Sequence, residues 1–143
     1  MGGRRPRAQS APMTSVFLVD DSPLIRDRLR AFLAGLPGVE AVGEAVGADA
    51  AIAAILETRP QVVLLDLHLA QGSGFDVLRA VRDAAPEIDV YMLSGYAAYP
   101  YRELAARLGA RGYFDKAREF DRVCEILAAR APCMLETTAG EPS

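Results

Sequence analysis

Five short apolar segments alternate with five segments of helical periodicity, and this alternation constrains the fold more than any other feature of the chain. The apolar segments are rich in β-branched residues, as expected for strands that are buried on both faces. Strands and helices in regular alternation favour an α/β fold, a doubly wound (βα)5 parallel sheet with helices on both faces. The predicted strands are Ser15 to Asp20, Val39 to Ala45, Gln61 to Asp66, Asp89 to Leu93 and Gly112 to Asp115.

The predicted helices have recognisable ends. Pro23 suits the first turn of the first helix, which Gly35 or Pro37 ends. Pro60 stops the second helix, and Gly109 suits the C-cap of the fourth. The helices are predicted from Pro23 to about Gly35, from Ala48 to Thr58, through Val77, Leu78 and Val81 to near Pro86, from Tyr99 to Leu108, and from Ala117 to Arg130.

Length and composition indicate one domain. A chain of 143 residues that is 51% hydrophobic can bury a core without disulfides. We expect a disordered leader at 1–14, a folded domain at 15–130 and a flexible tail at 131–143, too short for an output domain. Cys124 and Cys133 form neither a disulfide framework nor a zinc site with His68, the sole histidine. Such cysteines suit a reduced cytoplasm, where we expect the protein to be located.

Charge and hydropathy exclude two classes of partner. The leader carries three arginines, and the remaining 13 Lys and Arg face 19 Asp and Glu, a formal charge near −6. An acidic body argues against direct nucleic-acid binding. No hydrophobic run approaches the roughly 20 residues that a membrane-spanning helix needs. We therefore expect a soluble protein that does not enter a membrane.

Polar side chains stand at the carboxyl ends of four predicted strands, where ligands bind in sheets of this kind. Asp20 and Asp21 end the first strand, Asp66 ends the third, Ser94 follows the fourth and Lys116 follows the fifth. Three neighbouring carboxylates repel one another unless a cation lies among them. Oxygen ligands suit Mg²⁺, with Mn²⁺ as a possible substitute. The lysine and the hydroxyl add the groups that hold a phosphoryl group.

These motifs resemble the response-regulator receiver family of two-component systems, and the likeness runs from Ser15 to Arg130. The resemblance implies a stand-alone, single-domain member of this family. The motifs that carry the resemblance are Val16-Phe-Leu-Val-Asp20-Asp21 for the first strand and acidic pair, Val62-Val-Leu-Leu-Asp66 with Gly74 for the phosphoacceptor segment, Met92-Leu-Ser94 for the switch hydroxyl, and Gly109-Ala-Arg-Gly-Tyr113-Phe-Asp-Lys116 for the family's Gly-Ala-x-Gly-Tyr/Phe-x-x-Lys.

The resemblance implies a flavodoxin-like strand order, 2-1-3-4-5, and a role for each site residue. Asp66 would accept a phosphoryl group from a sensor histidine kinase, a histidine phosphotransfer protein or a small phosphodonor. Asp20 and Asp21 would hold Mg²⁺ together with Asp66 and the backbone carbonyl of His68. Lys116 would pair with a phosphoryl oxygen. The chain would catalyse only its own phosphorylation and dephosphorylation and would not be an enzyme acting on other substrates.

The resemblance also implies a switch. Ser94 would move towards the phosphoryl group, and Tyr113 would then rotate from an exposed to a buried rotamer. The signal would reach a downstream protein through the face of the fourth helix, fifth strand and fifth helix, in a monomer or a phosphorylation-dependent homodimer. His68 and Tyr96 occupy the positions that tune phosphoryl lifetime, and their bulk predicts slow self-dephosphorylation. Kinase and target are not identified by the sequence.

Other interpretations of the same residues remain open. Asp21 and Ser22 also suit a helix N-cap. A phosphohydrolase of the haloacid-dehalogenase type needs a second aspartate where this chain has His68. Flavin binding is disfavoured by the three carboxylates. A receiver-like module that is no longer phosphorylated is the remaining alternative. Ala70 and Ala117 replace prolines common in the family, but neither replacement removes a reactive group.

Overall fold

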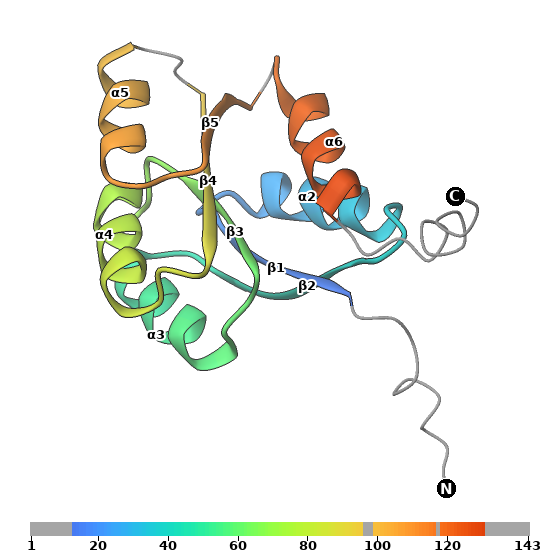
Figure 1. Ribbon diagram of the computed structural model, residues 1–143, viewed down its shortest axis with the longest axis horizontal. Coiled ribbons are helices and arrows are strands. Elements are labelled where there is room, and N and C mark those ends of the chain that lie inside the picture. The colour runs from blue at the N-terminus through green and yellow to red at the C-terminus, as the bar shows by residue number, and fades with distance from the viewer. Residues whose placement is uncertain (1–12, 96–98, 117, 131–143) are drawn as a thin grey trace, which may run out of the picture.

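The computed structural model describes residues 13–95, 99–116 and 118–130, so the predicted leader and tail lie almost wholly outside the described residues. Five parallel strands form one sheet in the order β2-β1-β3-β4-β5 (Figure 1). This result confirms the predicted (βα)5 architecture and its strand order. The strands are β1 (Thr14–Val19), β2 (Val39–Ala45), β3 (Val62–Asp66), β4 (Asp89–Ser94) and β5 (Gly112–Asp115).

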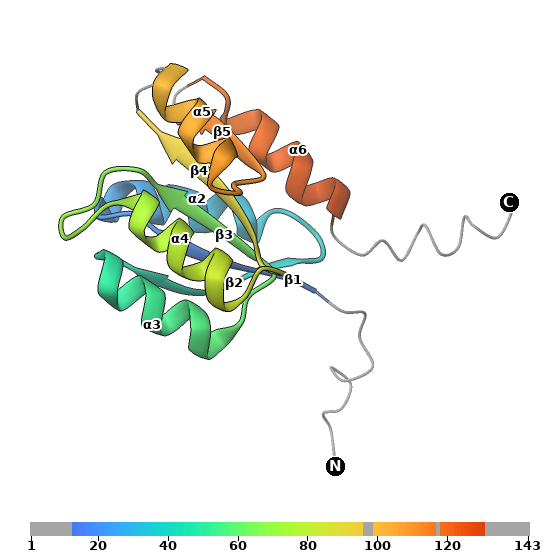
Figure 2. The same cartoon turned by 60° about the vertical axis from the view of Figure 1, so that its left-hand side comes forward.

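Helices cover both faces of the sheet. Figures 1 and 2 show α3, α4 and α5 on one face and α2 and α6 on the other. The helices are α2 (Pro23–Ala34), α3 (Ala48–Thr58), α4 (Gly74–Ala84), α5 (Tyr99–Arg107) and α6 (Phe120–Arg130). No helix within these described ranges is long and apolar enough to cross a membrane.

The core consists of two apolar layers, one on each side of the sheet. Side chains alternate between the faces along β1, so Phe17 packs in the layer under α3 and α4 while Val16 packs in the layer under α2 and α6. All five residues of β3 are buried, as expected of a central parallel strand. The apolar strands β1 and β3 therefore hold the residues at their carboxyl ends, including Asp66, in a rigid frame.

The last helix begins three residues later than the sequence predicts. Residue 117, its predicted start, lies outside the described residues, and 118–119 form a turn before the helix begins at Phe120. In that turn the Asp115 carboxylate accepts a hydrogen bond from the Arg118 N–H at 3.0 Å, and the Asp115 carbonyl accepts one from the Glu119 N–H at 2.9 Å. These two hydrogen bonds fold the chain after β5 into a single turn, and the regular helix begins only at Phe120.

Candidate functional site

The acidic pair lies in the turn between β1 and α2. The Asp20 Oδ1 atom accepts a hydrogen bond from the Ser22 N–H at 2.9 Å. Ser22 is the N-cap of α2, since its hydroxyl accepts a hydrogen bond from the Ile25 N–H at 3.3 Å, and Pro23 follows in the first turn. Helix capping thus falls to Ser22 and does not account for Asp21.

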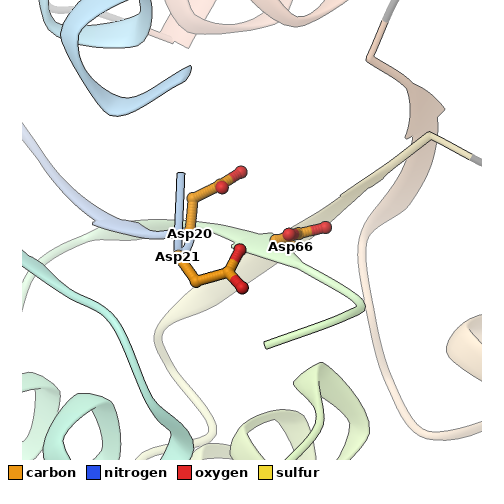
Figure 3. A group of neighbouring side chains, drawn as sticks. All are labelled: Asp20, Asp21 and Asp66. Carbon is orange, nitrogen blue, oxygen red and sulfur yellow. The ribbon is translucent and has the colours of Figure 1, made fainter. Parts of the chain in front are cut away.

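The carboxylates of Asp20, Asp21 and Asp66 meet at one edge of the sheet. Figure 3 shows the three side chains at the neighbouring ends of β1 and β3. One oxygen from each lies within 4.8 Å of the others. Asp20 and Asp66 are buried, at 1% and 6% exposure, whereas Asp21 is exposed.

This donor set fits a hard divalent cation. Ligands bound to Mg²⁺ at about 2.1 Å lie within roughly 4 Å of one another, a spacing that small side-chain adjustments would reach here. All three donors are carboxylate oxygens, which Mg²⁺ and Mn²⁺ prefer. Two of these carboxylates are buried, and the positive charge of a bound cation would lower the cost of burying them.

Lys116 brings a positive charge to the same carboxylates. Its Nζ atom lies 2.7 Å from Asp20 Oδ2 and 3.3 Å from Asp66 Oδ2. Burial alone would lower the pKa of this amine, but hydrogen bonding to Asp20 and the charges of both carboxylates outweigh burial and raise it. The backbone also fixes Lys116, because its N–H donates to the Ser94 carbonyl at 2.9 Å. It is the only lysine in the chain.

The site raises the pKa of the Asp66 carboxyl. Burial raises the pKa of its carboxyl from 3.8 to about 6, and the charge of Asp20 adds to this effect. The ammonium of Lys116 and a backbone hydrogen bond from His68 act in the opposite direction without cancelling it. Without a bound cation, Asp66 is therefore ionised only at some cost in stability.

The Asp66→Asn variant should be more stable than wild type in buffer free of divalent cations. Because the folded-state pKa is raised, the native protein binds the proton more tightly than the unfolded chain. Wild type should therefore lose stability as pH rises from about 4 to about 6. The advantage of asparagine should grow over that window and then level at about 2 kcal/mol, below the roughly 3 kcal/mol that the pKa shift alone implies, because solvent partly screens the carboxylate. Urea unfolding of both proteins at several pH values measures this difference in unfolding free energy. A difference that does not change with pH would contradict the raised pKa of Asp66.

The segment after Asp66 is held against α4. The Gly74 N–H donates to the Leu67 carbonyl at 2.8 Å, and His68 pairs with Ser73 in an isolated bridge. The His68 ring is exposed and makes an edge contact with the Tyr101 ring, with 6.3 Å between centroids. The backbone of His68 thus lies at the site, while its imidazole faces the surface beside α5.

The predicted switch pair lies inside the protein. Ser94, the last residue of β4, is fully buried, and Tyr113 in β5 is 5% exposed. A hydrogen bond links their side chains; it lowers the pKa of the Tyr113 hydroxyl, but burial has the larger effect and raises it. Tyr113 thus occupies the buried position, the second of the two rotamers that the sequence predicts. Tyr96, the other predicted lifetime residue, lies outside the described residues.

Two arginines that donate to backbone carbonyls of predicted site or switch residues were not found by sequence reasoning. Arg26 of α2 donates to the Asp20 carbonyl at 2.7 Å and pairs with Glu44 of β2, also at 2.7 Å. Arg102 of α5 donates to the Tyr113 carbonyl at 2.7 Å. The chain has 16 basic residues, most of them arginines, and nothing in their spacing separates these two from solvated ones.

Comparison with known proteins shows the family to which the chain belongs. The family model of the response regulator receiver domain matches residues 16–128. The transcriptional regulatory protein MctR of Rhizobium johnstonii is 33% identical over 129 residues, covering 90% of this chain and 56% of MctR. The DNA-binding transcriptional activator DevR/DosR of Mycobacterium tuberculosis is 34% identical over 104 residues, covering 73% of this chain and 48% of the activator.

The solved structures agree with the fold. The signal receiver domain of the response regulator NarL from Mycobacterium tuberculosis superposes with a TM-score of 0.78 at 27% identity, covering 85% of this chain and 98% of that domain. The chain spans about half the length of the two curated relatives described above. The DNA binding named for DevR/DosR is therefore a property of that longer protein.

Proposed function

Since the chain belongs to the response regulator receiver domain family, we propose that its Asp66 accepts a phosphoryl group in two-component signalling. The observation that carries this proposal is the position of Lys116, whose ammonium lies 3.3 Å from the Asp66 carboxylate and 2.7 Å from that of Asp20. At this edge of the sheet, Asp66 would supply the nucleophilic oxygen, Asp20 and Asp21 the cation-binding pair and Lys116 the fixed positive charge. Each is a part that phosphoryl transfer requires.

The reaction would proceed by nucleophilic attack of an Asp66 oxygen on phosphorus. A new P–O bond forms while the P–N bond of a phosphohistidine, or the P–O bond of a small acyl phosphate, breaks and its leaving group departs with the electron pair. Asp20, Asp21, Asp66 and the backbone carbonyl of His68 would hold Mg²⁺, which when bound neutralises phosphoryl charge. Lys116 would stabilise a phosphoryl oxygen, and the buried hydroxyl of Ser94 would donate to another.

The switch would carry the signal outwards through Ser94 and Tyr113. Their side chains are already hydrogen-bonded, so movement of Ser94 towards a phosphoryl group would disturb Tyr113 directly. Tyr113 belongs to the face of α5, β5 and α6, where we place the contact with a downstream protein. The donor would be a cytoplasmic sensor histidine kinase or a histidine phosphotransfer protein, and the protein would act as a monomer or a phosphorylation-dependent homodimer.

Incubation with acetyl phosphate and Mg²⁺ tests the proposal. Wild type should gain one phosphoryl group by intact-mass measurement, the gain should vanish in excess chelator, and Asp66→Asn should show none. If wild type remains unmodified with acetyl phosphate and with histidine kinases, the better interpretation is a receiver-like binding module that is no longer phosphorylated. Sustained release of inorganic phosphate from simple phosphate esters would instead support a phosphohydrolase.

The His68→Ala substitution should shorten the life of the aspartyl phosphate. The imidazole lies at the surface two residues beyond Asp66, in contact with the Tyr101 ring, and from there it would cover the solvent side of an aspartyl phosphate and restrict the approach of water. Loss of this ring should speed phosphoryl loss about threefold to tenfold, and Tyr96→Ala should act in the same direction. The decay of the phosphorylated mass after removal of the donor measures the rate; unchanged decay in both variants would refute shielding.

A further inference from the structure

One residue of α5 contacts both the backbone and the ring of Tyr113. The Arg102 Nη1 atom donates to the Tyr113 carbonyl at 2.7 Å, and the guanidinium carbon lies 5.2 Å from the centroid of the Tyr113 ring. Because β5 is the last strand of the sheet, its outward backbone groups have no neighbouring strand. Arg102 therefore supplies a charged donor to an edge carbonyl and a cation to the aromatic ring of the same residue.

The guanidinium is held in place from the other side by Glu119. The Arg102 Nη2 atom lies 3.4 Å from Glu119 Oε1, and that oxygen also accepts the Asp115 N–H at 2.9 Å. The side chains of Arg102 and Glu119 are 36% and 27% exposed. Arg102 thus joins α5 to β5 and to the turn that leads into α6, within the face expected to contact a downstream protein.

The arrangement favours one rotamer of Tyr113. Both anchors of Arg102, a backbone carbonyl and the Glu119 carboxylate, stay in place whichever way the tyrosine ring points. The contact between the guanidinium and the ring, by contrast, depends on where the ring points, and the structure shows it with the ring buried. A cation fixed independently of the ring therefore stabilises the buried position over an exposed one.

From these contacts we infer that Arg102, oriented by Glu119, is a positioning residue that holds Tyr113 in its buried rotamer and so biases the switch. The inference rests on the proposed function for its consequence in signalling, but the clamp itself concerns only Arg102, Glu119 and Tyr113. In this arrangement the position of α5 sets the rotamer of Tyr113 through Arg102. A protein that displaced α5 would release the ring, and one that secured α5 would retain it.

Fluorine NMR of protein labelled with 3-fluorotyrosine tests the clamp, because the chain has only five tyrosines. Tyr113→Phe identifies the Tyr113 resonance. In wild type without phosphodonor this resonance should be that of a shielded ring, with little response to a soluble paramagnetic agent. In Arg102→Ala the ratio of buried to exposed ring should fall by about threefold to tenfold, seen as a shifted or second resonance that responds to the agent.

Three further variants complete the test. Arg107→Ala removes an exposed arginine from the same helix and should leave the Tyr113 resonance unchanged. Arg102→Lys keeps the charge but loses the planar fork, and Glu119→Gln keeps Arg102 but weakens its anchor, so both should give intermediate shifts. If Arg102→Ala and Glu119→Gln are folded yet keep the wild-type resonance, the clamp is refuted and Arg102 has only a structural role.

A phosphorylation assay of Arg102→Ala distinguishes failure of this inference from failure of the proposed function. Arg102 makes no contact with the three carboxylates in the described part of the chain, so Arg102→Ala should still gain a phosphoryl group on Asp66. An unmodified wild type would overturn the proposed function and leave the clamp to be judged by the tyrosine resonance alone. A wild-type tyrosine resonance in a phosphorylated Arg102→Ala would overturn the clamp and leave the proposed function intact.

Discussion

Lys116→Met should lose about 3 kcal/mol of unfolding free energy in buffer without divalent cations. The substitution removes the ammonium that lies between the buried carboxylates of Asp20 and Asp66, and a buried charge without its partner is strongly destabilising. Phosphorylation by acetyl phosphate should also slow by about a hundredfold, since a positive charge near the transferring oxygens is lost. Urea unfolding and intact-mass time courses measure the two effects.

The effect of added Mg²⁺ on the stability of Lys116→Met tests where the cation binds. If the three carboxylates bind the cation, saturating Mg²⁺ should raise the stability of Lys116→Met more than that of wild type, because it restores a positive charge that the variant lacks. Arg118→Met is the control, since Arg118 is a nearby basic residue with an exposed side chain. Equal stabilisation of wild type and Lys116→Met by Mg²⁺ would contradict the placement of the cation among these carboxylates.

Gly74→Ala should destabilise the domain by about 2 kcal/mol and weaken Mg²⁺ binding. A Cβ atom at Gly74 would lie 2.4 Å from the Asp66 carbonyl oxygen and 3.0 Å from the Leu67 Cα, so the end of β3 must move. The preference for alanine over glycine, about 1 kcal/mol in a helix interior, offsets little of this overlap because Gly74 is the first residue of α4. Thermal unfolding and Mg²⁺ titration of the same samples measure both consequences.

Gly95→Ala is a matched control for that substitution. Gly95 directly follows Ser94 at the same edge of the sheet, and a Cβ there would meet nothing within 4 Å. Its effect on stability should stay within about 0.5 kcal/mol. A loss at Gly95 as large as that at Gly74 would show that any side chain near this edge is disruptive, and the close approach of Gly74 to Asp66 would no longer explain the result.

The sequence predicted the architecture because its signals are local. The apolar run at Val62–Asp66 and the proline at 60 mark a buried strand and its boundary without knowledge of any distant contact. Parallel topology then brings the carboxyl ends of the strands together, so Asp20, Asp66 and Lys116 could be placed at one edge before the structure was known. The structure confirms that placement with ion pairs of 2.7 and 3.3 Å.

The features that the sequence did not predict depend on contacts between segments far apart in the chain. The Arg102 clamp joins residues 11 and 17 positions apart, and the bond from Arg26 to Glu44 spans 18 positions. Periodicity assigns such arginines only to a helix surface. The rotamer of Tyr113 and the raised pKa of Asp66 likewise follow from burial among several elements, a property that one-dimensional spacing does not encode.

The site of phosphorylation can be identified chemically, which tests the central claim most directly. Wild type is phosphorylated with acetyl phosphate and Mg²⁺, treated with borohydride to reduce the acyl phosphate to an alcohol, digested and sequenced by mass spectrometry. The account predicts homoserine at position 66 and intact aspartate at positions 20 and 21. Homoserine at another position, or a phosphoryl group that resists reduction because it is attached to a hydroxyl or to nitrogen, would contradict it.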